Sequence, residues 1–208
     1  VITLGATRSP IDDIRYVQNT SSGNTGYRIA DHLYRHGHDI TCVSGITTCP
    51  KPNWLPLVIG ADSPDEMLNE LKALSNDDID AWIHCAAVLD YVVDTPAEGK
   101  LASQQGPLEV RLVESPKHIL ELREKCQGAV RIGFKLETGI KHKELVRRAV
   151  AQLEYAGMTA VIANRLEDLN DKTRPRAYLV DTTGADFTLN TINDVCVAVT
   201  TVIDRGNR

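Results

Sequence analysis

A stretch of small polar residues begins the part of the chain whose residue types could do chemistry. Ser21, Ser22 and Gly23 stand where the loop IRYVQNTSSGNTG turns into a helical pattern. Backbone N–H groups, hydroxyls and the helix dipole at such a place favour an anion, and a phosphate is the expected ligand. N-capping and turn formation account for the same residues without any ligand.

Two side chains upstream strengthen the hypothesis of an anion site. Arg15 can clamp a carboxylate or a phosphate with two N–H groups, and Asn19 can offer an amide donor to an acyl oxygen. A surface salt bridge is the alternative interpretation of Arg15.

This loop is not a dinucleotide fingerprint. The motif G-x-G-x-x-G is absent, and about 18 residues separate Gly5, at the end of an apolar run, from Gly23. A pyrophosphate-binding turn needs its glycines close to the strand, so the loop is too long for that role.

Asp90 and Lys100 are the next candidates. Asp90 comes just past the apolar run AWIHCAAVL, which makes it a candidate metal or hydroxyl partner, with a turn cap as the alternative. A long segment follows that contains Pro96, Gly99 and Gly106 and a single basic residue, Lys100. We expect a lid without regular structure, whose lysine neutralises phosphate charge on closing; a solvated loop lysine is the alternative.

The elements that must position these residues alternate between short apolar runs and amphipathic segments. Strands are predicted at 1–5, 39–45, 80–88, 129–134 and 159–164, with a hairpin around Thr183-Gly184. Helices are predicted at 24–37, 63–74, 115–126, 142–157 and 191–204, the second and third with a Ser-Pro start.

This alternation predicts an α/β fold, with a Rossmann-like doubly wound, mostly parallel sheet and helices on both faces. We expect a single domain over residues 1–208. In such sheets ligands bind beyond the carboxyl ends of the strands, which is where the candidate residues lie.

Composition argues against several classes of function. A net charge of −5 and 5% aromatic residues are not typical of a nucleic-acid binder. The apolar runs are far shorter than the roughly 18 residues of a membrane span, and no secretory signal pattern is found. Five widely spaced cysteines without a CxxC pair indicate reduced thiols. We therefore expect a cytoplasmic protein without nucleic-acid or membrane partners.

Six segments together resemble one family. In order and spacing, TRSPIDDIRYVQNTSSGNTGY, AAVLDY, GKLAS, SPKHIL, GFKLET and VIAN are similar to the motifs of phosphopantothenate–cysteine ligases, also called phosphopantothenoylcysteine synthetases. The resemblance extends to at least Asn164. Bacterial members are usually fused to a flavin-dependent decarboxylase domain, which this sequence lacks. The resemblance therefore implies a stand-alone form, or an excised half, without flavin.

The resemblance implies a reaction in coenzyme A biosynthesis. The family joins 4′-phosphopantothenate to cysteine through an acyl-nucleotide, with release of pyrophosphate and then of nucleoside monophosphate. Mg²⁺ is expected, because the charge of the triphosphate must be neutralised before an anionic carboxylate can attack it. Members are typically homodimers.

The resemblance also implies roles for individual residues. Asn19, Arg15 and Lys100 are the expected catalytic residues, with Asn19 at the acyl group and Lys100 on a flap over the reacting phosphates. Ser21, Ser22 and Gly23, with Asn19, match the loop beside phosphopantothenate. The expected nucleotide-binding residues, among which Asp90 is also the expected metal ligand, are Ala86, Ala87, Asp90, Lys100, Pro116, Lys117, His118, Ile119 and Phe134.

The sequence departs from the bacterial pattern in two places. Bacterial members carry more lysines after the flap lysine, where this chain has Leu101, Ala102 and Ser103, and two on the helix before VIAN, where it has Ala151 and Tyr155. GFKLET is closer to the eukaryotic form, which prefers ATP, whereas the N-terminal motif is closer to the bacterial form, which prefers CTP. The balance slightly favours CTP over ATP.

Two other functions stay open. The reduced number of lysines is compatible with a catalytically degenerate nucleotide-binding relative. An NAD(P)-dependent oxidoreductase fits the fold class, but the sequence lacks both the dinucleotide fingerprint and a Tyr-x-x-x-Lys pair.

Overall fold

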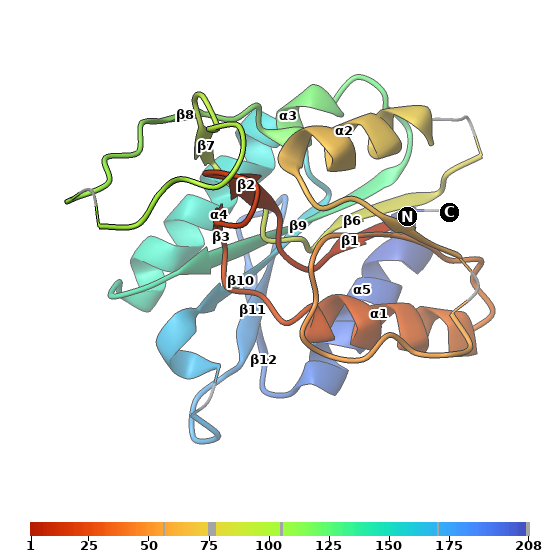
Figure 1. Ribbon diagram of the computed structural model, residues 1–208. Coiled ribbons are helices and arrows are strands. Elements are labelled where there is room, and N and C mark those ends of the chain that lie inside the picture. The colour runs from red at the N-terminus through yellow and green to blue at the C-terminus, as the bar shows by residue number, and fades with distance from the viewer. Residues whose placement is uncertain (56, 75–77, 105, 170, 207–208) are drawn as a thin grey trace.

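A mixed sheet crosses the whole molecule in the computed structural model, which describes residues 1–55, 57–74, 78–104, 106–169 and 171–206 (Figure 1). The order of its eight strands is β12-β11-β10-β9-β6-β1-β4-β5. The strands are β1 (Ile2–Leu4), β4 (Thr41–Ser44), β5 (Leu57–Gly60), β6 (Ala81–His84), β9 (Val130–Glu137), β10 (Ala160–Arg165), β11 (Ala177–Asp181) and β12 (Asp186–Leu189).

Most of this sheet is parallel. β1 pairs in parallel with β4 and β6, and the parallel pairing continues to β5 on one side and to β9 and β10 on the other. β11 and β12 are antiparallel and form the hairpin predicted around Thr183-Gly184, in which Gly184 has a φ of 77°. The predicted mostly parallel sheet is confirmed.

Helices cover both faces of the sheet, as predicted. α1 (Asn24–Arg35) and α5 (Ile192–Gly206) pack on one face, whereas α2 (Pro64–Ala73), α3 (His118–Glu121) and α4 (His142–Ala156) pack on the other (Figure 1). A short 3-10 helix, η1 (Leu166–Asp168), follows β10. Within the described residues, no helix has the length and apolar character needed to cross a membrane.

Two predictions about element boundaries are wrong. The segment 115–126 forms only the one-turn helix α3, whose N-cap is Lys117 and not Ser115. Ser115 directly follows β8 (Leu112–Glu114), and its N–H donates to the Asp90 carbonyl at 2.9 Å, so the chain is still extended there. The strand predicted at 80–88 ends at His84, because the chain then turns away and Ala87 forms a bridge with Ala6.

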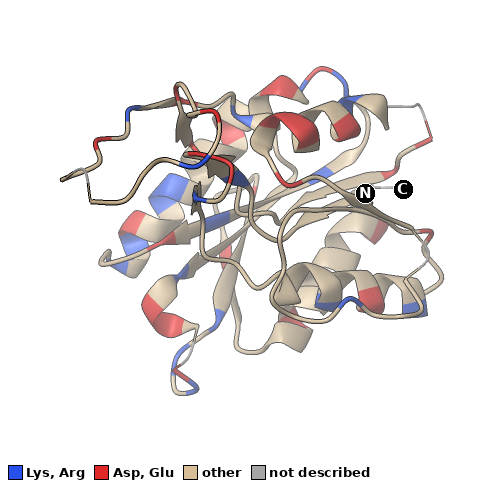
Figure 2. Cartoon of the chain, in the orientation of Figure 1, with Lys and Arg blue, Asp and Glu red and all other residues tan. Residues whose placement is uncertain are grey.

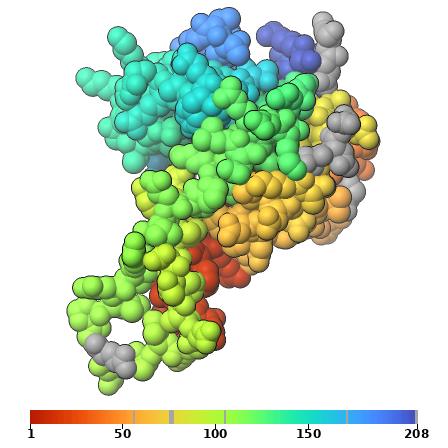
Figure 3. Space-filling view, turned by 90° about the horizontal axis from the view of Figure 1, so that it is seen from above, coloured from red at the N-terminus to blue at the C-terminus, as the bar shows by residue number. Residues whose placement is uncertain are grey.

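Two short hairpins lie outside the main sheet, one in the loop after β1 and one at the base of the expected lid. β2 (Arg8–Pro10) pairs with β3 (Tyr16–Gln18), and β7 (Tyr91–Val93) pairs with β8, in both cases antiparallel. The Ser9 hydroxyl accepts the Val93 N–H at 2.8 Å and joins the two hairpins. We name the described residues between β7 and β8, 94–104 and 106–111, the flap. It extends from the body as an arm (Figure 3).

Candidate functional site

The carboxyl end of β1 is where the candidate segments meet. Ala6 forms bridges with both Ile46, after β4, and Ala87, after β6. The Ala6 N–H donates to the Ile46 carbonyl at 2.9 Å, and the Ala87 N–H donates to the Gly5 carbonyl at 2.8 Å. The helix that follows β1 and the helix that precedes β6 lie on opposite faces, which makes this a switch point of the sheet, where doubly wound proteins bind ligands.

Glycines bring the start of α1 close to β1. A Cβ at Gly26 would lie 2.4 Å from the Leu4 Cβ, and one at Gly23, whose φ is 78°, would lie 2.5 Å from the Thr47 Cγ2. Only glycine allows this approach, which sets the preceding serines at the edge of the sheet. The glycines of this loop therefore serve close packing rather than a dinucleotide turn.

The serines of the loop are oriented by their own backbone surroundings. The Ser21 hydroxyl accepts the Gly23 N–H at 3.4 Å, and the Ser22 hydroxyl accepts the Asn24 N–H at 3.3 Å. The Ser22 carbonyl accepts the Thr48 N–H at 3.2 Å, so the loop is also fixed to the segment after β4. The turn-forming role of the serines is present, and it leaves Ser22 exposed at the sheet edge.

Asn19 joins the first loop to the end of β6. Its Nδ2 donates to the Val88 carbonyl at 3.0 Å and to the Ala87 carbonyl at 3.3 Å. In the described part of the chain, its side-chain oxygen has no hydrogen-bond partner. Two segments that the sequence placed in one site, one with Asn19 and one with Ala86 and Ala87, are thus in direct contact.

Arg15 forms an ion pair, which was one of its two interpretations from the sequence. Its partner is Asp12, a residue that the sequence analysis did not single out. Its Nη1 lies 2.5 Å from Asp12 Oδ2, and the Asp12 side chain is 0% exposed, against 37% for Arg15. Asp12 Oδ1 also accepts the N–H groups of Ile14 and Arg15. An aspartate that accepts the N–H groups of the second and third residues after it forms an Asx turn. The segment IDDIR contains an aspartate in a polar loop, which is the signal from which such a turn could have been predicted.

The electrostatics of Asp12 follow from these contacts. Desolvation by burial acts to raise its pKa, but the N–H donors of Ile14, Leu101 and Arg15 and the Arg15 charge together lower it. The carboxylate is therefore ionised throughout the neutral range.

Asp90 and Lys117 lie together at the rim of the site. Both are exposed, and the Lys117 Nζ lies 3.6 Å from Asp90 Oδ1. Lys100 is exposed on the flap and has no polar partner among the residues that the structure describes, so it does not contact Asp90.

The donor set at Asp90 limits how a metal could bind. No group of three or more His, Cys, Asp and Glu side chains suited to a metal occurs in the described ranges. Mg²⁺ is commonly held by one or two carboxylates together with substrate phosphates. The single exposed carboxylate of Asp90 fits an ion that arrives with a triphosphate.

The remaining predicted nucleotide-binding residues differ in accessibility. Pro116 is exposed, whereas His118 is buried and Ile119 is half-buried, with a carbonyl that accepts Arg131 Nη2 at 2.6 Å. Phe134 follows Gly133, the partner of His84 in the sheet, and packs against the core on the face that α1 and α5 cover. Pro116 is therefore open to a ligand, and the His118 side chain is enclosed.

Two titratable groups at the end of β6 are unsuited to proton transfer near neutral pH. Burial lowers the pKa of His84 to about 3, with further contributions from the charges of Arg131 and His118. Burial raises the pKa of the Cys85 thiol to about 12. His84 is therefore neutral and Cys85 remains a thiol, so this strand end can position and bind a ligand but supplies neither a base nor a thiolate.

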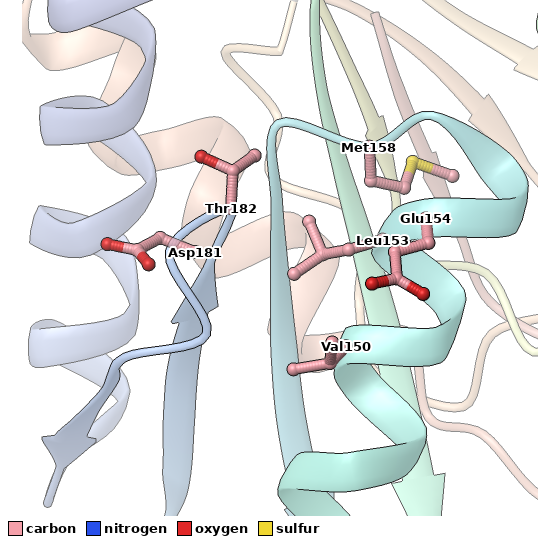
Figure 4. Close-up of a pocket in the computed structure, with 6 residues that line it drawn as sticks. All are labelled: Val150, Leu153, Glu154, Met158, Asp181 and Thr182. Atoms are coloured by element: carbon pink, nitrogen blue, oxygen red, sulfur yellow. The ribbon is translucent and has the colours of Figure 1, made fainter.

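Two cavities lie at the opposite edge of the sheet. One of about 110 Å³ lies between α4 and the turn after β11 and is lined by residues such as Leu153, Met158 and Asp181 (Figure 4). Another of about 600 Å³ lies beside the first residues of β1 and β6. Neither of these two cavities is lined by a predicted site residue.

The two arginines of α4 are paired with carboxylates. Arg147 and Arg148 both pair with Glu144, at 2.7 and 2.8 Å, and Arg148 also pairs with Glu137 at 2.6 Å. Charges of both signs are interspersed over the view in Figure 2. This pairing cancels part of the charge that Arg147 and Arg148 could offer to a phosphate.

The chain is similar to proteins of known description. The family model described as "DNA/pantothenate metabolism flavoprotein C-terminal domain" matches residues 1–203. The coenzyme A biosynthesis bifunctional protein CoaBC of Thermococcus kodakarensis is 36% identical over 168 residues, which make up 80% of this chain and 41% of that protein. The chain thus spans about two fifths of the length of this curated relative.

Solved structures share the fold. The crystal structure of the DNA/pantothenate metabolism flavoprotein from Streptococcus pneumoniae has a TM-score of 0.87 at 22% identity, over 98% of this chain and 97% of that one. A Cab2 mutant in complex with phosphopantothenate-cysteine has a TM-score of 0.77 at 18% identity, over 99% of this chain and 85% of that one. At these identities the likeness confirms the Rossmann-like fold.

Proposed function

Because the chain belongs to the family described as the DNA/pantothenate metabolism flavoprotein C-terminal domain, we propose that it is a ligase of coenzyme A biosynthesis. It joins 4′-phosphopantothenate to cysteine at the expense of a nucleoside triphosphate. The name of its CoaBC relative refers to coenzyme A biosynthesis, and the Cab2 structure holds phosphopantothenate-cysteine. The observation that carries the proposal is the hydrogen bonding of Asn19 to Ala87 and Val88, which assembles two motif segments at the switch point of the sheet.

The reaction needs positioning and charge stabilisation more than acid–base chemistry. A carboxylate oxygen of phosphopantothenate attacks the α-phosphorus of the nucleotide, and pyrophosphate leaves. The cysteine amine then attacks the acyl carbon and loses a proton, and nucleoside monophosphate leaves with the bonding electrons. An edge with a neutral His84 and a protonated Cys85 suits such a reaction, which effective concentration and fixed dipoles accelerate.

The residues of the site divide into three groups by position. Ser21, Ser22 and Gly23, at the start of α1, hold the phosphate of phosphopantothenate, and Asn19 orients the acyl group between the substrates. The nucleotide lies along Ala86, Ala87, Asp90, Pro116 and Lys117. His118 and Ile119 support this place from the face with α3, and Phe134 supports it from the face with α1 and α5. Arg15 and Lys100 stabilise charge on the reacting phosphates. Mg²⁺ held through Asp90 would supply further charge neutralisation of the triphosphate.

Several finer features belong to the same proposal. CTP is slightly favoured over ATP as the nucleotide, and no flavin takes part. We propose a cytoplasmic homodimer, and the five free thiols support a reducing compartment. Size-exclusion chromatography with light scattering measures the oligomeric state.

Pyrophosphate release tests the proposed function directly. Purified protein with Mg²⁺ and 4′-phosphopantothenate is offered CTP and ATP in parallel, with and without cysteine. Release with either nucleotide supports the ligase and assigns the base preference. Nucleotide binding without release from either nucleotide contradicts the ligase and supports a catalytically degenerate relative.

A further inference from the structure

We propose that Asp12 is a positioning residue, which fastens the flap to the loop that carries Arg15 and thereby sets the place of Lys100 over the nucleotide. The inference rests on the proposed function and adds to it a residue outside the sets assigned above. Asp12 itself contacts neither substrate in this arrangement. It acts through the flap.

Four donors converge on the Asp12 carboxylate. Oδ1 accepts the N–H groups of Ile14 at 2.9 Å and Arg15 at 2.7 Å. Oδ2 accepts the Arg15 guanidinium at 2.5 Å and the Leu101 N–H at 3.1 Å. Three donors belong to the loop and one belongs to the flap, so the carboxylate joins two segments that lie 89 positions apart.

The hydrogen bonds between the loop and the flap lie on both sides of Lys100. The Asp13 N–H donates to the Gly99 carbonyl at 3.3 Å, on one side of the lysine, and the Leu101 N–H donates to Asp12 on the other side. The Ala97 N–H also donates to the Ile11 carbonyl at 2.9 Å. Figure 3 shows the first residues of the chain beside the base of the arm. Because the Lys100 side chain has no partner of its own in the described ranges, its position follows from the backbone on either side.

Only a carboxylate can hold this arrangement. Both oxygens of Asp12 accept, and the side chain is 0% exposed, so water cannot replace a lost acceptor without a rearrangement. An asparagine keeps the size but offers one acceptor oxygen and an NH₂ group. The amide oxygen can keep the Asx turn with the N–H groups of Ile14 and Arg15, which places the NH₂ group where Oδ2 lies. There it cannot accept, so Asp12→Asn releases both the Leu101 N–H and the Arg15 guanidinium.

Hydrogen exchange at the Leu101 amide tests the attachment without any catalysis. In Asp12→Asn we expect this amide to exchange at least about 10-fold faster, as expected when a hydrogen bond that protects an amide is lost. Asp13→Asn is the matched control, because it removes the same charge from the neighbouring residue. The Asp13 side chain is exposed and forms no hydrogen bond or ion pair with the described residues. Unchanged Leu101 exchange in Asp12→Asn, or equal acceleration in both variants, overturns the proposal.

Kinetics then show whether Asp12 acts through Lys100. We expect Asp12→Asn to slow pyrophosphate release by about 10- to 100-fold, the effect of a misplaced group, with Asp13→Asn near wild type. In a Lys100→Gln background, Asp12→Asn should slow release by a smaller factor than in the wild type, because the part of its effect that acts through Lys100 is already gone and only the part through Arg15 remains. A loss of the same size in both backgrounds overturns the positioning role.

A second variant removes the flap donor and leaves the loop intact. Leu101→Pro lacks the N–H that Asp12 accepts, and it should slow release as Asp12→Asn does even if Asp12→Asn folds poorly. A wild-type rate in Leu101→Pro contradicts the proposal. If the wild-type protein releases no pyrophosphate, the proposed function itself fails and the positioning role with it. Release by wild type with unchanged Leu101 exchange in Asp12→Asn rejects the attachment alone.

Discussion

Replacing Gly26 by alanine tests whether the close approach of α1 to β1 keeps the proposed phosphate loop in place. The new methyl group would lie 2.4 Å from the Leu4 Cβ and 3.2 Å from the Leu4 Cδ2. Leu4 is 0% exposed within the core, so it has no free space into which to move. Carbon atoms pack at about 3.5–4.0 Å, and the first turn of α1 must therefore move away from β1 by about 1 Å.

The change in the free energy of unfolding of Gly26→Ala follows from two opposing contributions. Overpacking a well-packed core lowers the free energy of unfolding by about 1–3 kcal/mol. Alanine in place of glycine within a helix returns about 1 kcal/mol. The buried backbone of β1 cannot yield as a surface side chain would, so we expect a net loss of about 1–2 kcal/mol. Since each kcal/mol lowers the Tm of a chain of this size by about 2–4 °C, the Tm should fall by about 2–8 °C.

Gly60→Ala is the matched control for this substitution. A Cβ at Gly60, which ends β5, meets no atom within 4 Å, and the residue is not among those with positive φ. We expect the control to be neutral or to gain up to about 1 kcal/mol from the lower entropy of the unfolded chain.

Thermal unfolding by circular dichroism measures stability, and pyrophosphate release at varied phosphopantothenate measures the KM. Gly26→Ala should raise that KM, because the serine loop directly precedes α1. A variant at Gly26 that melts with the wild type and keeps its KM refutes the reasoning. An equal fall in Tm for Gly60→Ala refutes it as well.

Three further substitutions have defined outcomes. In Asn19→Asp, a carboxylate replaces the amide that donates to two carbonyl groups, so acyl-nucleotide should accumulate and the Tm should drop; full turnover would remove Asn19 from the mechanism. Lys100→Gln should slow pyrophosphate release at an unchanged Tm, because the side chain is exposed, and earlier melting at a normal rate would make Lys100 structural. His84, with a pKa near 3 when folded and 6.5 when unfolded, binds a proton only on unfolding. Wild-type stability should therefore fall by about 2 kcal/mol from pH 6.5 to pH 5. His84→Leu should abolish that part of the fall in urea midpoints, and an unchanged slope would contradict it.

Local signals explain which elements the sequence could predict. Ser63 and Pro64 begin α2 because the Ser63 hydroxyl accepts the Glu66 N–H and the Glu66 carboxylate accepts the Ser63 N–H. The same Ser-Pro pair at Ser115 starts no helix. The third residue after Ser115 is His118, which cannot complete a capping box as Glu66 does for Ser63. This difference between the two Ser-Pro segments could have been recognised from the sequence.

The short hairpins could not be predicted in this way. β2, β3, β7 and β8 have three residues each, too few for an alternating pattern to emerge. What stabilises them is non-local, such as the bond from the Val93 N–H to the Ser9 hydroxyl across 84 positions. Asp12 was missed for the same reason: the Asx turn is local, but its link to Leu101 depends on the tertiary fold.

In the proposed reaction, the charges around the site decide how much of the activation step depends on Lys100. Arg15 is paired with Asp12, and Lys117 is paired with Asp90, so part of the field of each cation is cancelled before a nucleotide arrives. On the flap itself, Arg111 lies 3.6 Å from Asp94. Lys100 is the cation of the described flap residues that has no carboxylate partner. An anchored flap with one unpaired lysine can deliver its full charge to a triphosphate at a defined place. The proposed reaction then does not need the additional lysines that the resemblance to bacterial members led us to expect. An active Lys100→Gln variant would contradict this explanation of their absence.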